Sequence, residues 1–298
     1  MRAIVSGATG YLGVELSARL AIDGVDLHAI LRPESDAGRL LNRVPDIALH
    51  RYDGSQSGLS AVLATVQPDT VFHLAGKYVR DETSADVPEL IAANITFGSQ
   101  LLEACRRTGI KRFINTGSHL QFCDHGTGAV NFYAAAKGAF AEVLAYYSGL
   151  GVFRTTSLIL FDTYGPGDWR HKLIPTLAAA QKQNIGIPLA NEALQLYPVY
   201  VSDVVDCYLL AAQILKDDPA GIHAGDFAVR GAEPSTIGDL VRTFEHVSGR
   251  PVPVVRGAWA DQTDKFRPIW RGTTLPGWEP RHVLKEGLRK CIQSCRPN

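Results

Sequence analysis

A tyrosine and a lysine stand four residues apart, at Tyr133 and Lys137. On a helix this spacing places the phenol and the ammonium group on one face, one turn apart. A free phenol has a pKa of about 10, and a nearby lysine charge together with a positive nicotinamide ring is expected to lower it. The tyrosine could then exchange a proton with a sugar or alcohol oxygen while hydride moves to or from the nicotinamide. We predict that Tyr133 and Lys137 also bind the cofactor, Lys137 through the nicotinamide ribose.

A hydroxyl group for the same reaction comes from Ser118, which we place just after a strand over residues 112–115. Its hydroxyl can hydrogen-bond the reacting oxygen and hold it against Tyr133. Thr116 offers a competing hydroxyl, but it lies nearer the strand and is expected to point at the sheet. The predicted catalytic residues are therefore Ser118, Tyr133 and Lys137.

A glycine-rich loop lies near the start of the chain and connects a short apolar strand to a helical pattern. Gly7 allows a tight turn, Gly10 lets the backbone approach a pyrophosphate, and Gly13 lets helix and strand pack closely. The phosphates would bind the free N–H groups at the positive end of the helix. The cofactor-binding residues predicted here are Gly7, Thr9, Gly10, Tyr11, Leu12 and Gly13.

The residue after the second strand usually selects the dinucleotide. An acid there binds the ribose 2′-hydroxyl of NAD, whereas an arginine accepts the 2′-phosphate of NADP. Arg32 stands at this place, and the nearest acid, Glu34, follows a proline, so NADP is favoured and NAD stays open. In the alternative interpretation, Arg32 only stacks on adenine or faces solvent. Asp53, followed by Gly54, is placed to accept from the adenine amino group, and the middle of the cofactor would be lined by Leu74, Ala75 and Gly76.

The elements that must position these residues alternate between strands and helices, which predicts an α/β fold with a doubly wound, mostly parallel Rossmann sheet. Ligands bind such a sheet at the carboxyl ends of its strands. A smaller mixed α/β substrate lobe is expected after Tyr164, where proline and glycine become frequent, with a return to the sheet near residues 199–215. We assign residues 1–163 plus about 199–230 to the NAD(P)-binding domain, and residues 164–198 plus about 231–298 to the substrate lobe. Helices are expected over residues 11–23, 59–66, 87–107 and 133–147, and strands over 3–6, 27–31, 47–51, 70–74, 112–115 and 152–161.

Composition narrows the class of protein. The chain has 298 residues, 46% of them hydrophobic, which suits one large domain or a domain with a smaller lobe. Its 30 basic and 30 acidic residues balance, which argues against a nucleic-acid partner. Five cysteines without framework spacing indicate reduced thiols, and we expect no metal site. The sequence shows no transmembrane stretch or signal peptide, so we expect a cytoplasmic protein without a membrane partner.

Together these motifs resemble the extended short-chain dehydrogenase/reductase family over nearly the whole chain. Three later motifs are typical of its nucleotide-sugar branch, in which the C-terminal lobe holds the diphosphate of an activated sugar: residues 164–166, 199–203 and 277–278. The resemblance adds Asn94 to the cofactor residues. It also implies a homodimer, in which helices 87–107 and 133–147 of two chains form a four-helix bundle.

Within that branch, residues 116–121 and 161–168 are similar to 4-ketoreductases of the CDP-abequose-synthase type. Epimerases more often have Asn in place of Asp162 and an aromatic residue in place of Gln121. The 4,6-dehydratases carry an acidic pair after the active hydroxyl, and none stands at residues 119–121. Many members grip the diphosphate with an Arg-Asp pair, which Leu196-Tyr197 replaces here. The clamp must then come from elsewhere, and the candidates are Arg170, Lys172 and Arg267. The predicted substrate-binding residues are Ser118, His119, Gln121, Asp162, Arg170, Lys172, Leu173 and Arg267.

Three functions stay open. The favoured one is reduction of the 4-keto group of a nucleotide-linked deoxysugar, with hydride from NADPH and a proton from Tyr133. The second is a nucleotide-sugar 4-epimerase that holds NAD tightly and uses the same residues to oxidise and re-reduce C4. The third is a non-catalytic NADP-binding sensor, although such relatives usually lose the tyrosine or the lysine, and both are present here. A substrate that is not a nucleotide sugar also stays possible.

Overall fold

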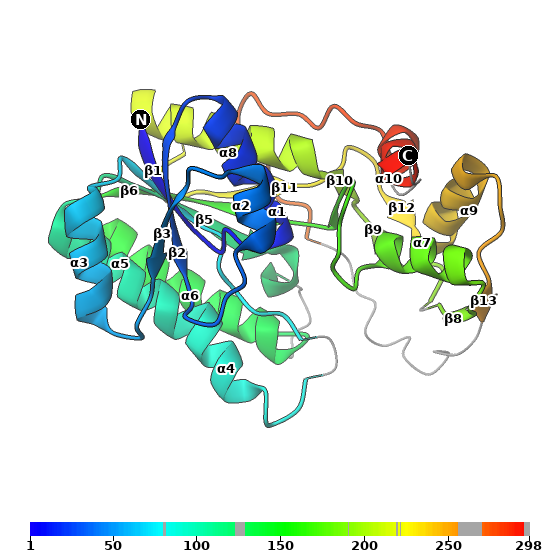
Figure 1. Ribbon diagram of the computed structural model, residues 1–298, viewed down its shortest axis with the longest axis horizontal. Helices are drawn as coiled ribbons and strands as arrows, with labels where there is room; N and C mark the ends of the chain where they lie inside the picture. The colour runs from blue at the N-terminus through cyan, green and yellow to red at the C-terminus, as the bar shows by residue number, and fades with distance from the viewer. Residues whose placement is uncertain are drawn as a thin grey trace.

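The computed structural model describes residues 1–79, 82–122, 129–189, 191–218, 220, 222–255 and 270–294. Its centre is a sheet of seven parallel strands in the order β11-β6-β5-β4-β1-β2-β3 (Figure 1). This is the strand order of a Rossmann fold, which confirms the predicted doubly wound α/β class. The strands are β1 (Arg2–Ser6), β2 (Asp26–Leu31), β3 (Ala48–Arg51), β4 (Thr70–His73), β5 (Arg112–Ser118), β6 (Arg154–Leu160) and β11 (Asp226–Val229).

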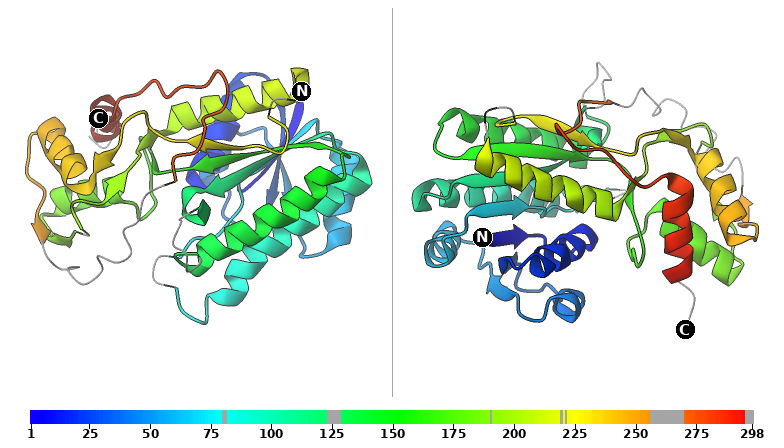
Figure 2. Two further views of the ribbon diagram at one scale, coloured as in Figure 1. Left: turned by 180° about the vertical axis from the view of Figure 1, so that it is seen from behind. Right: turned by 90° about the horizontal axis from the view of Figure 1, so that it is seen from above.

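Helices cover both faces of the sheet (Figures 1 and 2). One face carries α1 (Tyr11–Ile22), α2 (Gly38–Arg43) and α8 (Val201–Asp217), and the other carries α3 (Gln56–Val66), α5 (Phe97–Thr108) and α6 (Phe132–Gly149). Each set of helices shares a buried apolar cluster with its face of the sheet. The central strands are buried on both sides, as parallel strands between two helical layers must be.

The structure differs from the single long helix predicted over residues 87–107. The segment α4 (Val87–Ile91) passes into a π-helical turn, η1 (Ala92–Thr96), before α5 begins. The wider turn directs Asn94 inward, where it is 1% exposed. Its amide accepts from the Lys77 N–H at 3.1 Å and donates to the Lys77 carbonyl at 2.8 Å. Turns of this kind are frequent at functional sites, and this one fixes the loop that follows β4.

Near residues 199–215, where a return to the sheet is predicted, the chain packs against one face of the sheet as the helix α8. The two-residue strand β10 (Val199–Tyr200) pairs with β7 (Thr163–Tyr164), and the helix α8 follows it directly. The strand that joins the central sheet is β11, which is hydrogen-bonded to β6.

A smaller lobe follows β7 and lies beside the Rossmann part (Figure 2). The three helices that the structure describes in this lobe share a buried cluster of their own. The lobe contains α7 (Leu173–Gln183), β8 (Ile187–Pro188), β9 (Gln195–Leu196), β12 (Ser235–Thr236), α9 (Ile237–Ser248), β13 (Val254–Val255) and α10 (Leu284–Ser294). Although residues from about 231 onward were assigned to the substrate lobe, the chain crosses back over the Rossmann part before α10. There Leu275 and Trp278 join the cluster of α1 and α8, and the Ala228 N–H donates to the Thr273 carbonyl at 2.7 Å.

A buried carboxylate anchors this crossing. Asp203 on α8 accepts from the backbone N–H groups of Arg281 and His282 at 3.1 and 3.0 Å, and its Oδ1 lies 2.7 Å from His282 Nδ1. The indole N–H of Trp278 donates to the Asp203 carbonyl at 2.9 Å. These contacts join the two motifs that contain Asp203 and Trp278, and they satisfy a carboxylate that is almost fully buried.

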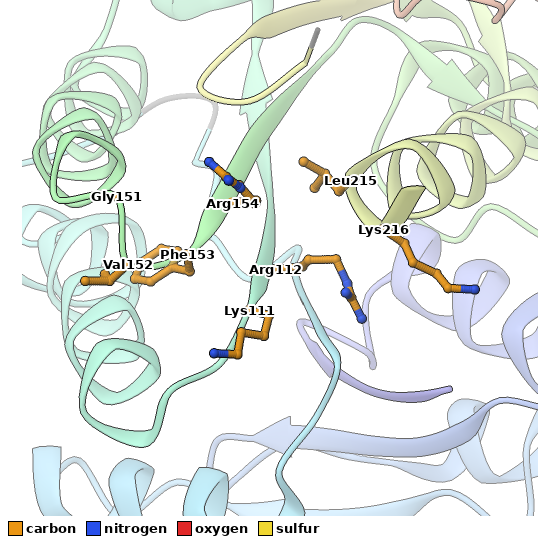
Figure 3. A pocket seen from close by; sticks show the side chains of 8 residues that line it. All are labelled: Lys111, Arg112, Gly151, Val152, Phe153, Arg154, Leu215 and Lys216. Carbon is orange, nitrogen blue, oxygen red and sulfur yellow. The ribbon is translucent and has the colours of Figure 1, made fainter. Parts of the chain in front are cut away.

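The amino-terminal edge of the sheet carries a surface hollow of about 330 Å³, far from the ends of the strands that position the predicted site. Figure 3 shows its cationic side chains spread around the hollow rather than turned toward one point. Arg112 among them already donates to Thr70 Oγ1 at 3.1 Å. The hollow is lined by Lys111, Arg112, Gly151, Val152, Phe153, Arg154, Leu215 and Lys216. Within the described ranges, no helix has the length and apolar character needed to cross a membrane.

Candidate active site

The glycine loop joins β1 to α1 at the carboxyl edge of the sheet. Gly7 has a φ of +74°, and a Cβ there would lie 2.6 Å from the Ala75 nitrogen. A Cβ at Gly13 would lie 2.1 Å from the Gly7 carbonyl oxygen, whereas at Gly10 the nearest atom is that oxygen at 3.3 Å. Thr9 is half-buried and Gly10 is exposed. Packing therefore requires glycine at two of these positions, and the third leaves bare backbone that suits a phosphate.

We expect Gly13→Ala to lower the free energy of unfolding by about 1–3 kcal/mol, because its methyl group would overlap the Gly7 carbonyl. The loop would have to shift, so NADPH binding should weaken as well. Gly138→Ala is the matched control: Gly138 lies in α6 with nothing near its missing Cβ, and the change should stabilise the protein by up to about 1 kcal/mol. Chemical denaturation measures both, and equal effects of the two changes would contradict this explanation.

The side chains of the loop do not all face the cofactor position. Tyr11 is 2% exposed, and its hydroxyl donates to the Pro166 carbonyl at 3.1 Å. Trp169 meets its ring edge-on, and the Arg170 guanidinium lies over the ring. Leu12 is buried in the cluster beneath α1. The Tyr11 side chain thus ties α1 to the segment after β7, and the predicted contacts of Tyr11 and Leu12 with the cofactor stay predictions, which their backbone N–H groups would make.

Arg32 follows β2 at the edge of the same site, with 59% of its side chain exposed. Its Nε lies 3.2 Å from a carboxylate oxygen of Glu34, and its Nη1 lies 3.4 Å from Glu89 on α4. Arg51 Nη1 donates to three backbone carbonyls of the segment that carries Arg32, those of residues 32, 33 and 35. The segment is thus held by its backbone, and Glu34 pairs with the arginine.

Asp53 is placed by a turn that begins α3. Its carboxylate accepts from both the N–H and the hydroxyl of Ser55, each at 2.8 Å. These hydrogen bonds lower the pKa of the exposed Asp53 carboxylate. The Ser55 hydroxyl in turn accepts from the Gly58 N–H at 2.9 Å. Gly54, between Asp53 and Ser55, has a φ of +89°. One Asp53 oxygen therefore caps a turn, a contact that the sequence prediction of an adenine ligand did not include.

Ser118 and Tyr133 are brought together by β5 and α6. The strand runs three residues further than predicted, so Ser118 ends β5 instead of following it. The side chains of Ser118 and Tyr133 are hydrogen-bonded to each other. Asn131 caps α6 by accepting from the Ala134 N–H at 2.8 Å, which sets the helix start just before the tyrosine. The Thr116 hydroxyl, 2.6 Å from the Tyr208 hydroxyl, faces α8 instead.

Lys137 lies one turn after Tyr133 and is 5% exposed. Its ammonium group donates to the Thr116 carbonyl at 3.0 Å, and burial lowers the pKa of Lys137 to about 8. A Cβ at Gly76 would lie 3.2 Å from Lys137 Nζ and 2.8 Å from Asn94 Oδ1. Gly76 therefore presents bare backbone beside the ammonium group, at the end of the loop that Asn94 holds.

Burial and hydrogen bonding set the electrostatics of Tyr133. Burial raises the pKa of Tyr133 to about 12, and the hydrogen bond with Ser118 acts in the opposite direction. The ammonium group of Lys137 is directed to the Thr116 carbonyl. In the protein without cofactor, burial therefore dominates the pKa of Tyr133, and the lowering expected from Lys137 together with a bound nicotinamide ring stays a prediction. At neutral pH the phenol is protonated, which is the form that can donate a proton.

Two predicted substrate residues follow Ser118 in the short helix η2 (His119–Phe122). The Gln121 side-chain oxygen accepts from the Ser118 N–H at 3.1 Å, so it supports the end of β5. The His119 ring stacks on Phe161, with 4.7 Å between the ring centres. Burial lowers the pKa of His119, and the Asp162 carboxylate and the Lys172 ammonium group act on it with opposite sign. His119 therefore lies within electrostatic range of both the Asp162 carboxylate and the Lys172 ammonium group.

Lys172 is linked to Tyr133 through the ring of Tyr78, a residue that the sequence analysis did not single out. Its ammonium group lies 5.1 Å from the ring centre of Tyr78, and the Tyr78 ring meets the Tyr133 ring edge-on at 5.1 Å. Tyr78 stands in the loop after β4, where no periodic pattern marks it. The Asp162 carboxylate accepts a hydrogen bond from the Tyr197 N–H at 3.4 Å.

Arg170, one of the three candidates for the phosphate clamp with Lys172 and Arg267, forms an ion pair in this structure. Its Nε and Nη2 each donate to the Asp168 carboxylate at 2.8 Å, and Nη2 also donates to the Thr163 carbonyl at 2.9 Å. The Asp168 side chain is only 2% exposed, so this ion pair fastens the loop. Leu173 begins α7 and packs on the cluster of the smaller lobe. Arg267 lies outside the described residues.

Comparison with known proteins decides the family. Residues 3–224 match the family model described as the NAD dependent epimerase/dehydratase family. This chain belongs to that family. A family relative, the CDP-abequose synthase of Yersinia pseudotuberculosis, is 28% identical over 215 residues, which cover 70% of this chain and 72% of that protein. A UDP-glucose 4-epimerase of Mycolicibacterium smegmatis is 25% identical, and the alignment covers 99% of both chains.

A solved structure supports the same fold. The UDP-glucuronic acid 4-epimerase of Bacillus cereus, in complex with UDP-glucuronic acid and NAD, has a TM-score of 0.83 to this chain at 20% identity, covering 99% of this chain and 98% of the other. The family match and the relatives confirm the predicted resemblance and the class of NAD(P)-dependent enzyme.

Proposed function

We propose that the enzyme uses NADPH to reduce the 4-keto group of a nucleotide-linked deoxysugar, with Tyr133 as the proton donor. The observation that carries this proposal is the hydrogen-bonded pair of Ser118 and Tyr133, one helical turn from the buried Lys137. A phenol that burial keeps protonated suits the direction in which a carbonyl oxygen gains a proton.

The residues around this pair fit a dinucleotide. Gly10 and Gly76 present bare backbone at the loop after β1 and at the loop after β4, and Lys137 places a positive charge beside Gly76. When bound, the nicotinamide supplies the hydride. Lys137, largely protonated at neutral pH, would bind the nicotinamide ribose. Ser118 would orient the keto oxygen by hydrogen bonding, and Tyr133 would give that oxygen its proton.

The likeness to a CDP-abequose synthase supports the choice of a ketoreductase, as does Asp162 in the place where epimerases more often carry Asn. Epimerisation is the alternative. It is favoured by a UDP-glucose 4-epimerase relative that aligns over 99% of both chains and by the NAD in the matching structure. The same three catalytic side chains would serve both reactions. The homodimer, the cytoplasmic location and the division into two domains stay predictions.

Purified enzyme, NADPH and the 4-keto-6-deoxyglucose derivatives of CDP, dTDP and UDP provide the test. We expect the NADPH absorbance to fall with at least one of these sugars. If none of them consumes NADPH, while UDP-glucose is converted without added cofactor and NAD is released on denaturation, the epimerase replaces the reductase. Mass spectrometry of the released small molecules separates NAD from NADP in the same sample.

A further inference from the structure

Two cations flank the strand that carries the nucleotide loop, and they share one carboxylate. Arg32 follows β2 and Lys77 lies beyond β4, and these two strands pair with β1 on either side. Glu89 on α4 joins them: its Oε1 lies 3.4 Å from Arg32 Nη1, and its Oε2 contacts Lys77 Nζ. Figure 1 shows α4 close to the carboxyl ends of these strands. Each carboxylate oxygen of Glu89 thus serves one cation.

The backbone that carries the two cations is held firmly. Asn94 binds both the N–H and the carbonyl of Lys77. Arg51 binds three carbonyls around Arg32. Glu89 stands in the first turn of α4, and 51% of its side chain is exposed. The exposed Glu89 carboxylate can therefore turn into solvent while the backbone that carries both cations stays in place.

The charges of the cluster suit a doubly charged anion. Lys77 first and then Arg32 lower the pKa of Glu89, so its carboxylate is ionised at neutral pH. One carboxylate supplies a single negative charge to two cations, and Glu34 supplies a second to Arg32 alone. A phosphate monoester carries nearly two negative charges and several acceptor oxygens, so it can bind the guanidinium and the ammonium group together.

We propose that Arg32 and Lys77 together form the site for the 2′-phosphate of NADP(H), and that Glu89 fills this site until the cofactor displaces it. The inference rests on the proposed function only in taking NADP(H) as the cofactor. NAD carries a hydroxyl at this position, which cannot replace a carboxylate between two cations. Glu89 therefore competes with NADP(H) and leaves NAD(H) largely unaffected.

Direct titration of the purified protein with NADPH and with NADH, followed by cofactor fluorescence without any sugar, tests this inference. Glu89→Gln should lower the Kd for NADPH about threefold to tenfold and leave that for NADH within about twofold, as expected for one exposed charge. Lys77→Met should raise the Kd for NADPH by a similar factor, because it removes one of the two positive charges. The loop should keep its position, because the backbone contacts of residue 77 with Asn94 persist. Glu142→Gln, an exposed acid on α6, is the matched control and should change neither Kd.

The inference is overturned if Glu89→Gln binds NADPH no better than the unmodified protein, or if it binds NADPH and NADH equally more tightly. Adenosine 2′-phosphate and adenosine 5′-phosphate serve as smaller probes, and only the first should bind more tightly to Glu89→Gln. Because no sugar is present, this result is independent of the reaction. A protein that passes the binding test but reduces no sugar would overturn the proposed reductase and leave this inference standing.

Discussion

Replacing Tyr133 by phenylalanine is expected to lower kcat for ketone reduction by about a thousandfold, the loss typical of a removed general acid. The phenyl ring can keep its edge-on contact with Tyr78, so the change removes the proton donor and little else. The Kd for NADPH should stay within about threefold, because the lost hydroxyl is not predicted to hold the phosphates. Steady-state kinetics and cofactor titration measure the two effects separately.

The pH dependence sharpens this prediction. Burial raises the pKa of Tyr133 to about 12, so the donating form persists well above neutral pH. Lys137 has a pKa of about 8 and is charged only below it, so cofactor binding should weaken as the pH rises through about 8. Tyr146→Phe, an exposed tyrosine on the same helix, should be silent. If Tyr133→Phe kept more than a tenth of kcat, the proton would have to come from another group.

The sheet could be predicted from sequence because its strands are short apolar runs, and some of them end at recognisable motifs such as the glycine loop. The runs that became β1 and β4 are buried on both sides, and the glycine loop marks the turn between β1 and α1. The π-helical turn at Asn94 was missed because its cause lies elsewhere in the chain: the amide binds Lys77, 17 residues earlier. Periodicity reports which face of a helix is buried, and it does not report a single distant hydrogen bond.

The proximity of the candidate catalytic side chains was predictable for a similar reason. Tyr133 and Lys137 are one turn apart on one helix, so their relation is local. The partners of charged residues were not predictable, since they come from other elements. From sequence, Arg170 is a candidate cation for a phosphate, but the structure shows its guanidinium paired with the Asp168 carboxylate and donating to the Thr163 carbonyl. Glu89 is 57 residues from Arg32, and only the fold brings the two together.

Replacing Arg32 by glutamine is expected to weaken NADPH binding by about tenfold to a hundredfold and NADH binding far less. A hydrogen bond to a charged group contributes about 1.5–3 kcal/mol, and each factor of ten in Kd corresponds to about 1.4 kcal/mol. Because 59% of the side chain is exposed, salt should screen the interaction and bring the effect toward the lower limit. Titrations with both cofactors at low and high salt measure this.

Arg43→Gln provides the matched control, since Arg43 is an exposed arginine paired with Glu15 on the neighbouring helix α1. It should leave both affinities unchanged. Equal weakening of NADPH and NADH by Arg32→Gln would mean that the guanidinium stacks on adenine, and the preference for NADP would fall with it. If Arg32 binds the 2′-phosphate and Glu89 competes with that phosphate for Arg32, the increase in NADPH affinity caused by Glu89→Gln should be smaller when Arg32 is already glutamine. A double-mutant cycle on the Kd for NADPH measures that coupling, and additive effects would separate the two residues.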